Sequence, residues 1–291
     1  MIAWAAGDGA AVVLRALVYL DLLLLAGLLL CTRRTAPGDV SAPVIAGLAG
    51  AGAILAIAQL VVTALAMTGG DTAVLDAPML RFIAFETSAG LSAIVRFLCL
   101  AVLAALAARA VRSRALHTVL ALAALAALAW TGHAGASEGA TGTFHRTADI
   151  LHLLAASAWL GTLVLLFFAL ARSHTATADL IAALRRFAIT GTLIVGTLLV
   201  TGAVNLWAIA GVDSLPALAA SDYGRVLGLK LLLFGAMLGF AGFNRWRLTP
   251  RLEVASRSAM GGLRTSVTLE TLFAIGVILA VALLGTLSPN G

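Results

Sequence analysis

Three of the five histidines in this 291-residue chain lie in one short stretch, as His133, His145 and His152. Asp149 stands between the last two of them, four residues after His145 and three before His152. In a helix, positions i, i+4 and i+7 share one face, and Trp159 would extend that face. Imidazole nitrogen suits copper and zinc, and a carboxylate one turn away can ligate the ion or hold the second ring N–H. The stretch therefore predicts metal or proton chemistry.

Helix geometry limits how these histidines can share one ion. Residues seven apart are separated by about 10.5 Å along a helix axis, whereas a metal–nitrogen bond is about 2 Å long. Either His145 lies before the helix begins, or the histidines define two successive positions. Thr147 is a suitable N-cap for a helix beginning at Ala148, which favours the first alternative. His133, His145 and His152 would then converge.

Other side chains that we expect on the same side of the membrane could add ligands or support the site. Met67 and Met79 flank one connection, and their thioether groups would favour Cu(I). Glu86 opens the next apolar run, and Trp130 directly precedes the histidine stretch. Methionine at a helix end is more often packing material than a ligand. We treat Met67, Met79 and Glu86 as additional candidate ligands and Trp130 as a supporting residue.

The surrounding sequence is that of a helical membrane protein. Hydrophobic residues make up 62% of the chain, charged residues 11%, and the mean hydropathy is +1.06. About 20 apolar residues span a bilayer core as a helix, and alternating barrel strands are absent from the sequence. We expect an all-α, polytopic membrane protein, a single integral membrane domain over 1–291. Its eight predicted spans cover residues 10–31, 42–66, 84–108, 115–131, 147–171, 185–209, 223–244 and 264–286.

The basic residues predict the orientation of the bundle. Thirteen of the 19 Lys and Arg residues lie in the connections after the first, third, fifth and seventh spans. The opposite connections carry most of the Asp and Glu residues. By the positive-inside rule, these odd-numbered connections are cytoplasmic and both termini are periplasmic. The net charge of +6 is therefore a topology signal, and we expect no nucleic-acid partner.

Charged residues within the spans are costly in lipid and need partners or water. Asp21 and Arg96 both lie about 16–18 Å deep at 1.5 Å per residue, and we predict that they pair, either to lock two helices or beside a transport path. Lys230 lies about 10 Å below the outer surface. We expect Arg245 or Arg247 to neutralise Glu270.

Five glycines in the seventh span share one helical face and predict close packing against a neighbouring helix. They are Gly224, Gly228, Gly235, Gly239 and Gly242.

Several motifs resemble the CopD family of bacterial copper resistance and copper uptake proteins. They are TGHAG with HRTADILHLLAASAWLGTLVL at 145–165, RRFAITGTLIVGTLLVTGAVNLW at 185–207 and YGRVLGLKLLLFGAMLGFAGFNRWRLTPRL at 223–252. The resemblance is good over residues 131–252. It implies an eight-span bundle that moves copper across the inner membrane, often served by a periplasmic CopC-type carrier, which would here be a separate protein. His133, Asp149, His152 and Trp159 match family positions, and His145 also fits the pattern.

The resulting hypothesis is a copper transporter, not an enzyme, that accepts Cu(I) or Cu(II) from the periplasm at His133, His145 and His152. Asn205, Lys230 and the Asp21–Arg96 pair would lie along or beside the route. Two alternatives come from other classes. One is a b-type haem protein that uses His133 and His152 as ligands. The other is a copper-binding sensor or scaffold that does not transport the ion.

Overall fold

The computed structural model describes residues 6–35, 40–111, 113–132, 139–171, 177–211, 218, 220–254 and 257–288. Within these ranges the chain is helical throughout, with short turns and no β-strand. The long helices are α1 (Ala6–Thr35), α2 (Ala42–Met67), α4 (Ser88–Ala108), α7 (Gly139–Ala171), α8 (Thr177–Ala210), α10 (Asp222–Phe243) and α12 (Arg257–Leu284). The short ones are η1 (Thr72–Val74), α3 (Ala77–Glu86), α5 (Arg114–Ala126), η2 (Ala127–Trp130), the π-helical η3 (Asn244–Leu248) and α11 (Thr249–Glu253).

Seven helical segments of the described chain are long and apolar enough to cross a membrane. The predicted fourth span, 115–131, corresponds to α5 followed by η2. This segment, Arg114–Trp130, is apolar but shorter than the others, below the roughly 20 residues that a bilayer core requires. The all-helical, multi-span architecture is thus confirmed, with seven full-length candidates.

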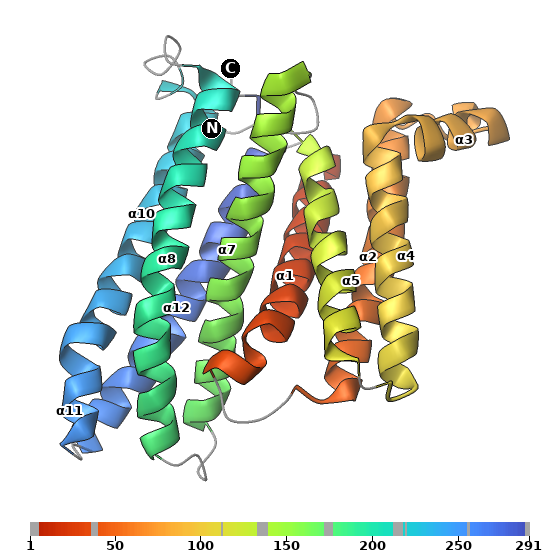
Figure 1. Cartoon of the computed structure of the whole chain (residues 1–291). Helices are drawn as coiled ribbons and strands as arrows, with labels where there is room; N and C mark the ends of the chain where they lie inside the picture. The colour runs from red at the N-terminus through yellow and green to blue at the C-terminus, as the bar shows by residue number, and fades with distance from the viewer. Residues whose placement is uncertain are drawn as a thin grey trace.

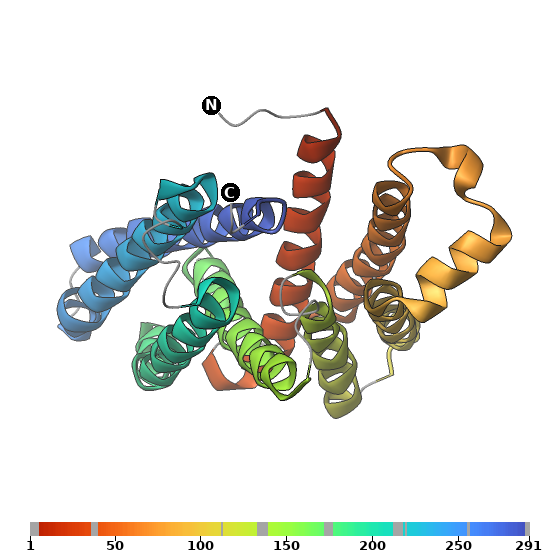
Figure 2. The ribbon, with the colours of Figure 1, turned by 90° about the horizontal axis from the view of Figure 1, so that it is seen from above.

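Helix α1 runs through the middle of the bundle and contacts α2 and α5 on one side and α7 and α12 on the other. Viewed from above, it separates the α2–α4 pair from the group formed by α7, α8, α10 and α12 (Figure 2). Helix α1 begins, α12 ends and α7 begins at the same end of the bundle (Figure 1). The first and last helices therefore share an end with the histidine-bearing helix.

The crossing of α1 and α7 depends on two glycines. A Cβ atom added to Gly161 would collide with the backbone of Gly27, and one added to Gly27 would collide with the carbonyl oxygen of Ser157. Small residues allow such close backbone approach between membrane helices. This contact joins the two halves of the bundle.

The glycine face of α10 does not pack as predicted. An added Cβ atom at Gly228, Gly235 or Gly239 would meet nothing within 4 Å, and at Gly242 it would meet the ring of Trp246 from the same helical segment. Helix α10 makes its main contacts with α12. The glycine spacing correctly marks one face, but that face is open within this chain.

Candidate functional site

The helix that carries the histidines begins earlier than the sequence predicts. Helix α7 begins at Gly139, which adopts a left-handed φ of 65°. The hydroxyl of Thr143 donates to the carbonyl oxygen of Gly139 at 3.2 Å, and that of Thr147 donates to Thr143 at 2.8 Å. Both threonines thus bond one turn back, as they do inside helices. The predicted N-cap role of Thr147 is wrong.

His145 consequently lies inside α7, where it is only 2% exposed. Its separation from His152 along the axis is about 10.5 Å, because the two residues are seven positions apart in the helix. The alternative in which His145 precedes the helix is therefore wrong, and these two imidazoles occupy successive levels. His133 lies outside the described residues, so its role as a ligand stays a prediction, as does the haem alternative that needs it.

His152 is oriented by a hydrogen bond from a neighbouring helix. Its Nδ1 lies 2.9 Å from Oγ1 of Thr201 on α8. The Thr201 hydroxyl donates its single proton to the carbonyl oxygen of Thr197, at 2.5 Å. Since that proton is already used, Thr201 accepts from Nδ1–H, and the backbone of Leu198 makes a further hydrogen bond to the imidazole. Such a second contact fixes both the tautomer and the ring plane of metal-binding histidines.

The neighbouring glycine on α8 leaves room for this ring. A Cβ atom at Gly202 would lie 3.6 Å from Cε1 of His152, so the imidazole packs directly over the glycine. The hydroxyl of Thr201 and the bare backbone of Gly202 together define the position of the ring.

A carboxylate and an amide lie one turn nearer the start of α7. Nδ2 of Asn205 donates to Oδ1 of Asp149 at 3.3 Å, which links α8 to α7 a second time. The amide oxygen of Asn205 is buried and has no hydrogen-bond partner among the described residues. An unpartnered buried acceptor of this kind is rare in native structures and calls for an explanation such as water or an ion. Asp149 and Asn205 therefore offer oxygen donors beside His152.

Two further residues place charge or a hydroxyl close to this carboxylate. Lys230 of α10 lies within electrostatic range of both Asp149 and His152. Tyr19 of α1 lies within electrostatic range of Asp149. We call Asp149, His152, Thr201, Asn205 and Lys230 the histidine site.

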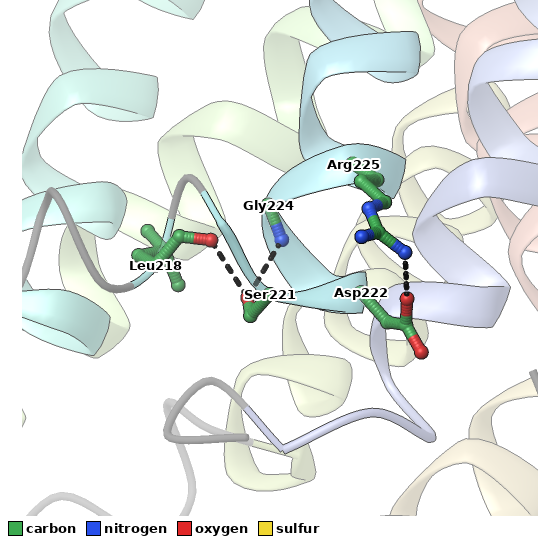
Figure 3. A network of polar contacts seen from close by, with 5 residues as sticks. All are labelled: Leu218, Ser221, Asp222, Gly224 and Arg225. Carbon is green, nitrogen blue, oxygen red and sulfur yellow. Dashed lines mark hydrogen bonds and ion pairs between the residues drawn. The ribbon is translucent and has the colours of Figure 1, made fainter.

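The position of Lys230 depends on how α10 begins. The hydroxyl of Ser221 accepts from the backbone N–H of Gly224 at 3.1 Å and donates to the carbonyl oxygen of Leu218 at 2.7 Å (Figure 3). This is the ordinary side-chain cap of a helix N-terminus. In the same view Arg225 reaches back to Asp222 at 2.8 Å (Figure 3). That exposed pair contributes little stability, and the Ser221 cap is the contact that fixes the start of the helix.

The histidine site does not form a complete metal site. No group of three or more His, Cys, Asp and Glu side chains lies close enough to hold one ion in the described part of the chain. Asp149 and His152 supply one carboxylate and one imidazole, and Asn205 supplies an amide oxygen. Two strong donors and one weak donor can accept a metal ion transiently, which differs from a closed structural site with four protein ligands.

The additional candidate ligands lie elsewhere. Met79 and Glu86 are on α3, which packs against α4 and α2, and Figures 1 and 2 show α3 on the far side of the bundle from α8 and α10. Met67 is 53% exposed, and Trp130 is 43% exposed. The structure therefore does not bring Met79 and Glu86 to His152, whereas η2, which ends at Trp130, contacts α7. The roles of all four residues stay predictions.

The predicted pair between Asp21 and Arg96 is wrong. Arg96 is 1% exposed, and its Nη1 donates to Oε1 of Gln59 at 2.7 Å while its Nε donates to the carbonyl oxygen of Ser92 at 3.3 Å. Asp21 packs against α2 at Gly52, and its Oδ2 has no hydrogen-bond partner in the described structure. Similar depth does not ensure a pair, because the acceptors that reach Arg96 belong to α2 and to its own helix.

Trp159 lies farther along α7 and is 3% exposed. Its ring makes edge-to-face contacts with Phe187 of α8, at a centroid distance of 6.4 Å, and with Phe234 of α10, at 5.9 Å. We call these three rings the aromatic layer. It lies about two helical turns from His152 along α7, so Trp159 supports the packing and is not a neighbour of the imidazole.

Two residues of this region are hard to recognise in the sequence. Thr201 lies 49 residues from His152, in a run of Thr, Val and Leu typical of a lipid-facing helix. Tyr19 precedes Asp21 by two positions and therefore points elsewhere on α1. Thr201 lies four residues before Asn205, and residues four apart share a helix face. That spacing was the one sign in the sequence that Thr201 could lie beside the site.

The fold and site together define a multi-pass helical membrane protein with a buried polar site between its helices. Residues 181–284 match the family model described as Copper resistance protein D, and residues 1–143 match that of the Copper resistance protein D-like, N-terminal domain. No solved structure matches the chain.

Two curated relatives agree with these matches. The chain is 32% identical over 304 residues to Copper resistance protein D of Pseudomonas syringae pv. tomato, covering 97% of this chain and 98% of the relative. It is 31% identical over 163 residues to Inner membrane protein YebZ of Escherichia coli (strain K12), covering 54% of each. The chain belongs to the copper resistance protein D family. It is a multi-pass inner membrane protein, and the resemblance seen in residues 131–252 extends over nearly its whole length.

Proposed function

We propose that this protein transports copper across the inner membrane, from the periplasm to the cytoplasm, and that the histidine site accepts the ion. Membership of a copper resistance family supports copper as the substrate. The observation that carries the site is the hydrogen bond between Nδ1 of His152 and Thr201, which orients the imidazole on the helix that carries Asp149 one turn earlier. An imidazole held in one tautomer next to a carboxylate is an arrangement suited to a transition metal.

The proposed ligands are Nε2 of His152, the carboxylate of Asp149 and the amide oxygen of Asn205. This nitrogen and oxygen set favours Cu(II), since Cu(I) prefers sulfur ligands. Either His133 or an exchangeable carrier ligand would complete the coordination. Lys230 would limit affinity by charge repulsion, so that the ion is released again.

The proposed topology has eight spans, with α5 and η2 as the short one, and both termini in the periplasm. The positive-inside distribution supports this orientation. It places the beginning of α7, and with it the histidine site, in the periplasmic half. A separate periplasmic carrier would deliver copper there, and transport itself would involve no enzymatic step.

Copper uptake into proteoliposomes tests the proposal, with Cu(I) and Cu(II) supplied separately. We expect His152→Ala and Asp149→Asn to reduce uptake at least tenfold, because each removes a strong ligand. His133→Ala tests the ligand that lies outside the described residues. His117→Gln serves as the matched control, since it removes an imidazole from α5 and should leave uptake unchanged.

Three outcomes of these experiments would contradict the proposal or favour another function. Equal uptake by the wild type, His152→Ala and Asp149→Asn would contradict the site. Copper binding that depends on His152 without any uptake would instead favour a sensor or scaffold. Purified protein with the absorption spectrum of haem would favour the b-type haem protein.

A further inference from the structure

A second polar region lies beyond the aromatic layer, at a cavity of about 380 Å³. Helices α7, α8, α10, η3 and α12 surround this cavity, and Trp159 lines one side of it. Glu270 of α12 and Asn244 of η3 line its polar part. We call it the Glu270 cavity.

Glu270 is only 1% exposed, although it carries an ionisable group. Nδ2 of Asn244 donates to its Oε1, but its Oε2 has no hydrogen-bond partner in the described chain. The amide oxygen of Asn244 is also buried without a partner in the described chain. The hydroxyl of Ser266, one turn before Glu270 on α12, lies within hydrogen-bonding range of the carboxyl group. Oxygen atoms from three side chains therefore lie at one place, and two of these atoms have no partner.

The basic residues expected to neutralise Glu270 do not do so. Arg245 lines the same cavity, but its Nη1 donates to the carbonyl oxygen of Ala188 and to Oγ1 of Thr192, each at 3.0 Å. Arg247 is exposed. Burying a carboxylate without a counter-charge is strongly unfavourable. Within the described residues, neither of these arginines therefore supplies a positive charge to Glu270.

The backbone at Asn244 is specialised. Residues Asn244–Leu248 form a π-helical turn between α10 and α11, and Oγ1 of Thr249 donates to the carbonyl oxygen of Asn244 at 2.9 Å. Single π-helical turns inside α-helices occur frequently at functional sites. Here the turn directs the Asn244 amide toward α12.

We propose that Glu270, Asn244 and Ser266 bind a hard monovalent cation, with Na⁺ as the probe ion. Each of the three side chains would offer an oxygen atom as ligand, and hard cations prefer oxygen ligands. No imidazole or sulfur side chain lines the described cavity, so the site does not suit copper. One formal negative charge balances one positive charge. A proton on Oε2 could donate to one neighbouring oxygen and so satisfy two atoms, whereas a coordinated cation would contact all three.

Thermal unfolding of the full chain in detergent, without copper, tests this site. Na⁺ is titrated against choline at constant ionic strength. A ligand that binds only the folded protein raises the unfolding midpoint with concentration, so we expect a rise in the wild type. Glu270→Gln should abolish that rise. Asp21→Asn is the matched control, because it changes another buried carboxyl with an unpartnered oxygen and should keep the rise.

Ser266→Ala provides a milder variant if Glu270→Gln does not fold. It should raise the half-saturating Na⁺ concentration about tenfold through loss of one neutral ligand. The proposal would be overturned if the unfolding midpoint of the wild type did not change with Na⁺ concentration, or if it changed with pH alone. Because the assay contains no copper, its failure would leave the copper proposal untouched, and failure of copper uptake would leave this site standing.

Discussion

Two buried polar regions of this bundle handle the same physical problem differently. In the first, between α2 and α4, the guanidinium of Arg96 bonds to Gln59 and to the backbone of Ser92. In the second, between α7 and α8, Thr201 satisfies one nitrogen of His152, while the amide oxygen of Asn205 keeps no partner. Burial of a polar group in a membrane bundle is costly in either case.

The difference lies in what remains after the internal contacts are made. Arg96 is neutralised by dipoles that belong to neighbouring helices, and its contacts lock α2 to α4. Asp21 of α1 also has an unpartnered oxygen, and this oxygen packs against Gly52 of α2. In this comparison, the region around Arg96 uses its polar groups to hold helices together. The histidine site keeps an acceptor atom that a metal ion could use.

The largest expected effect comes from breaking the glycine contact between α1 and α7, which joins the two halves of the bundle. Gly161→Ala forces a Cβ atom into the backbone of Gly27, and such overpacking should lower the free energy of unfolding by about 3 kcal/mol. Gly235→Ala is the control, because its Cβ meets nothing and the substitution favours helix by about 1 kcal/mol. Thermal unfolding in detergent measures both. Equal stability of the two variants would contradict the close crossing of α1 and α7.

A smaller loss of stability should follow from changing the acceptor of Arg96. Gln59→Leu removes the oxygen that binds Nη1 and should cost about 2 kcal/mol, since the bond involves a charged donor. Copper uptake per folded molecule should stay at the wild-type level. Gln59→Glu keeps an acceptor and should retain stability. Loss of uptake in folded Gln59→Leu would show that the first region is not purely structural.

The second region should respond in copper affinity more than in stability. Thr201→Val keeps the side-chain volume but removes the acceptor of Nδ1, so the imidazole loses its fixed tautomer. We expect copper affinity to fall tenfold or more, in the range found for outer contacts of metal ligands. Thr197→Val, one turn earlier on α8, should have no effect. Isothermal titration with Cu(II) distinguishes them, and equal affinities would remove Thr201 from the site.

The smallest effect should come from charge near the site. Lys230→Gln removes a positive charge within electrostatic range of Asp149 and His152. Copper affinity should rise a few-fold, an effect of about 0.5–1 kcal/mol. Arg225→Gln removes an exposed basic residue from the start of the same helix and should change nothing. A decrease in affinity with Lys230→Gln would mean that the lysine supports Asp149 instead of limiting copper.

The helices were accessible from the sequence, because apolar length and helix period depend on local residues. Asp149 and His152 share a face of α7 for that reason. The start of α7 was placed too late because Gly and Thr between residues 139 and 147 read as a connection. In the structure the threonine hydroxyls satisfy helix carbonyl groups and let the helix continue.

Contacts between helices were much harder to predict. Depth alone suggested that Asp21 and Arg96 meet, but the rotation of each helix about its axis decides which side chains face each other. The sequence contains no direct measure of that rotation. The partner of Arg96 is therefore Gln59, and the partner of His152 is Thr201, each from a helix that composition alone describes only as apolar.

The aromatic layer of Trp159, Phe187 and Phe234 has an electrical consequence. It lies between the histidine site and the Glu270 cavity, so under the proposed function the insulating part of this half of the bundle would be thinner than the bilayer. Under the proposed function, an ion that passes Trp159 would cross most of the membrane voltage there. Moving one elementary charge through 100 mV corresponds to about 2.3 kcal/mol, so the resting potential alone would draw a copper ion inward across this layer.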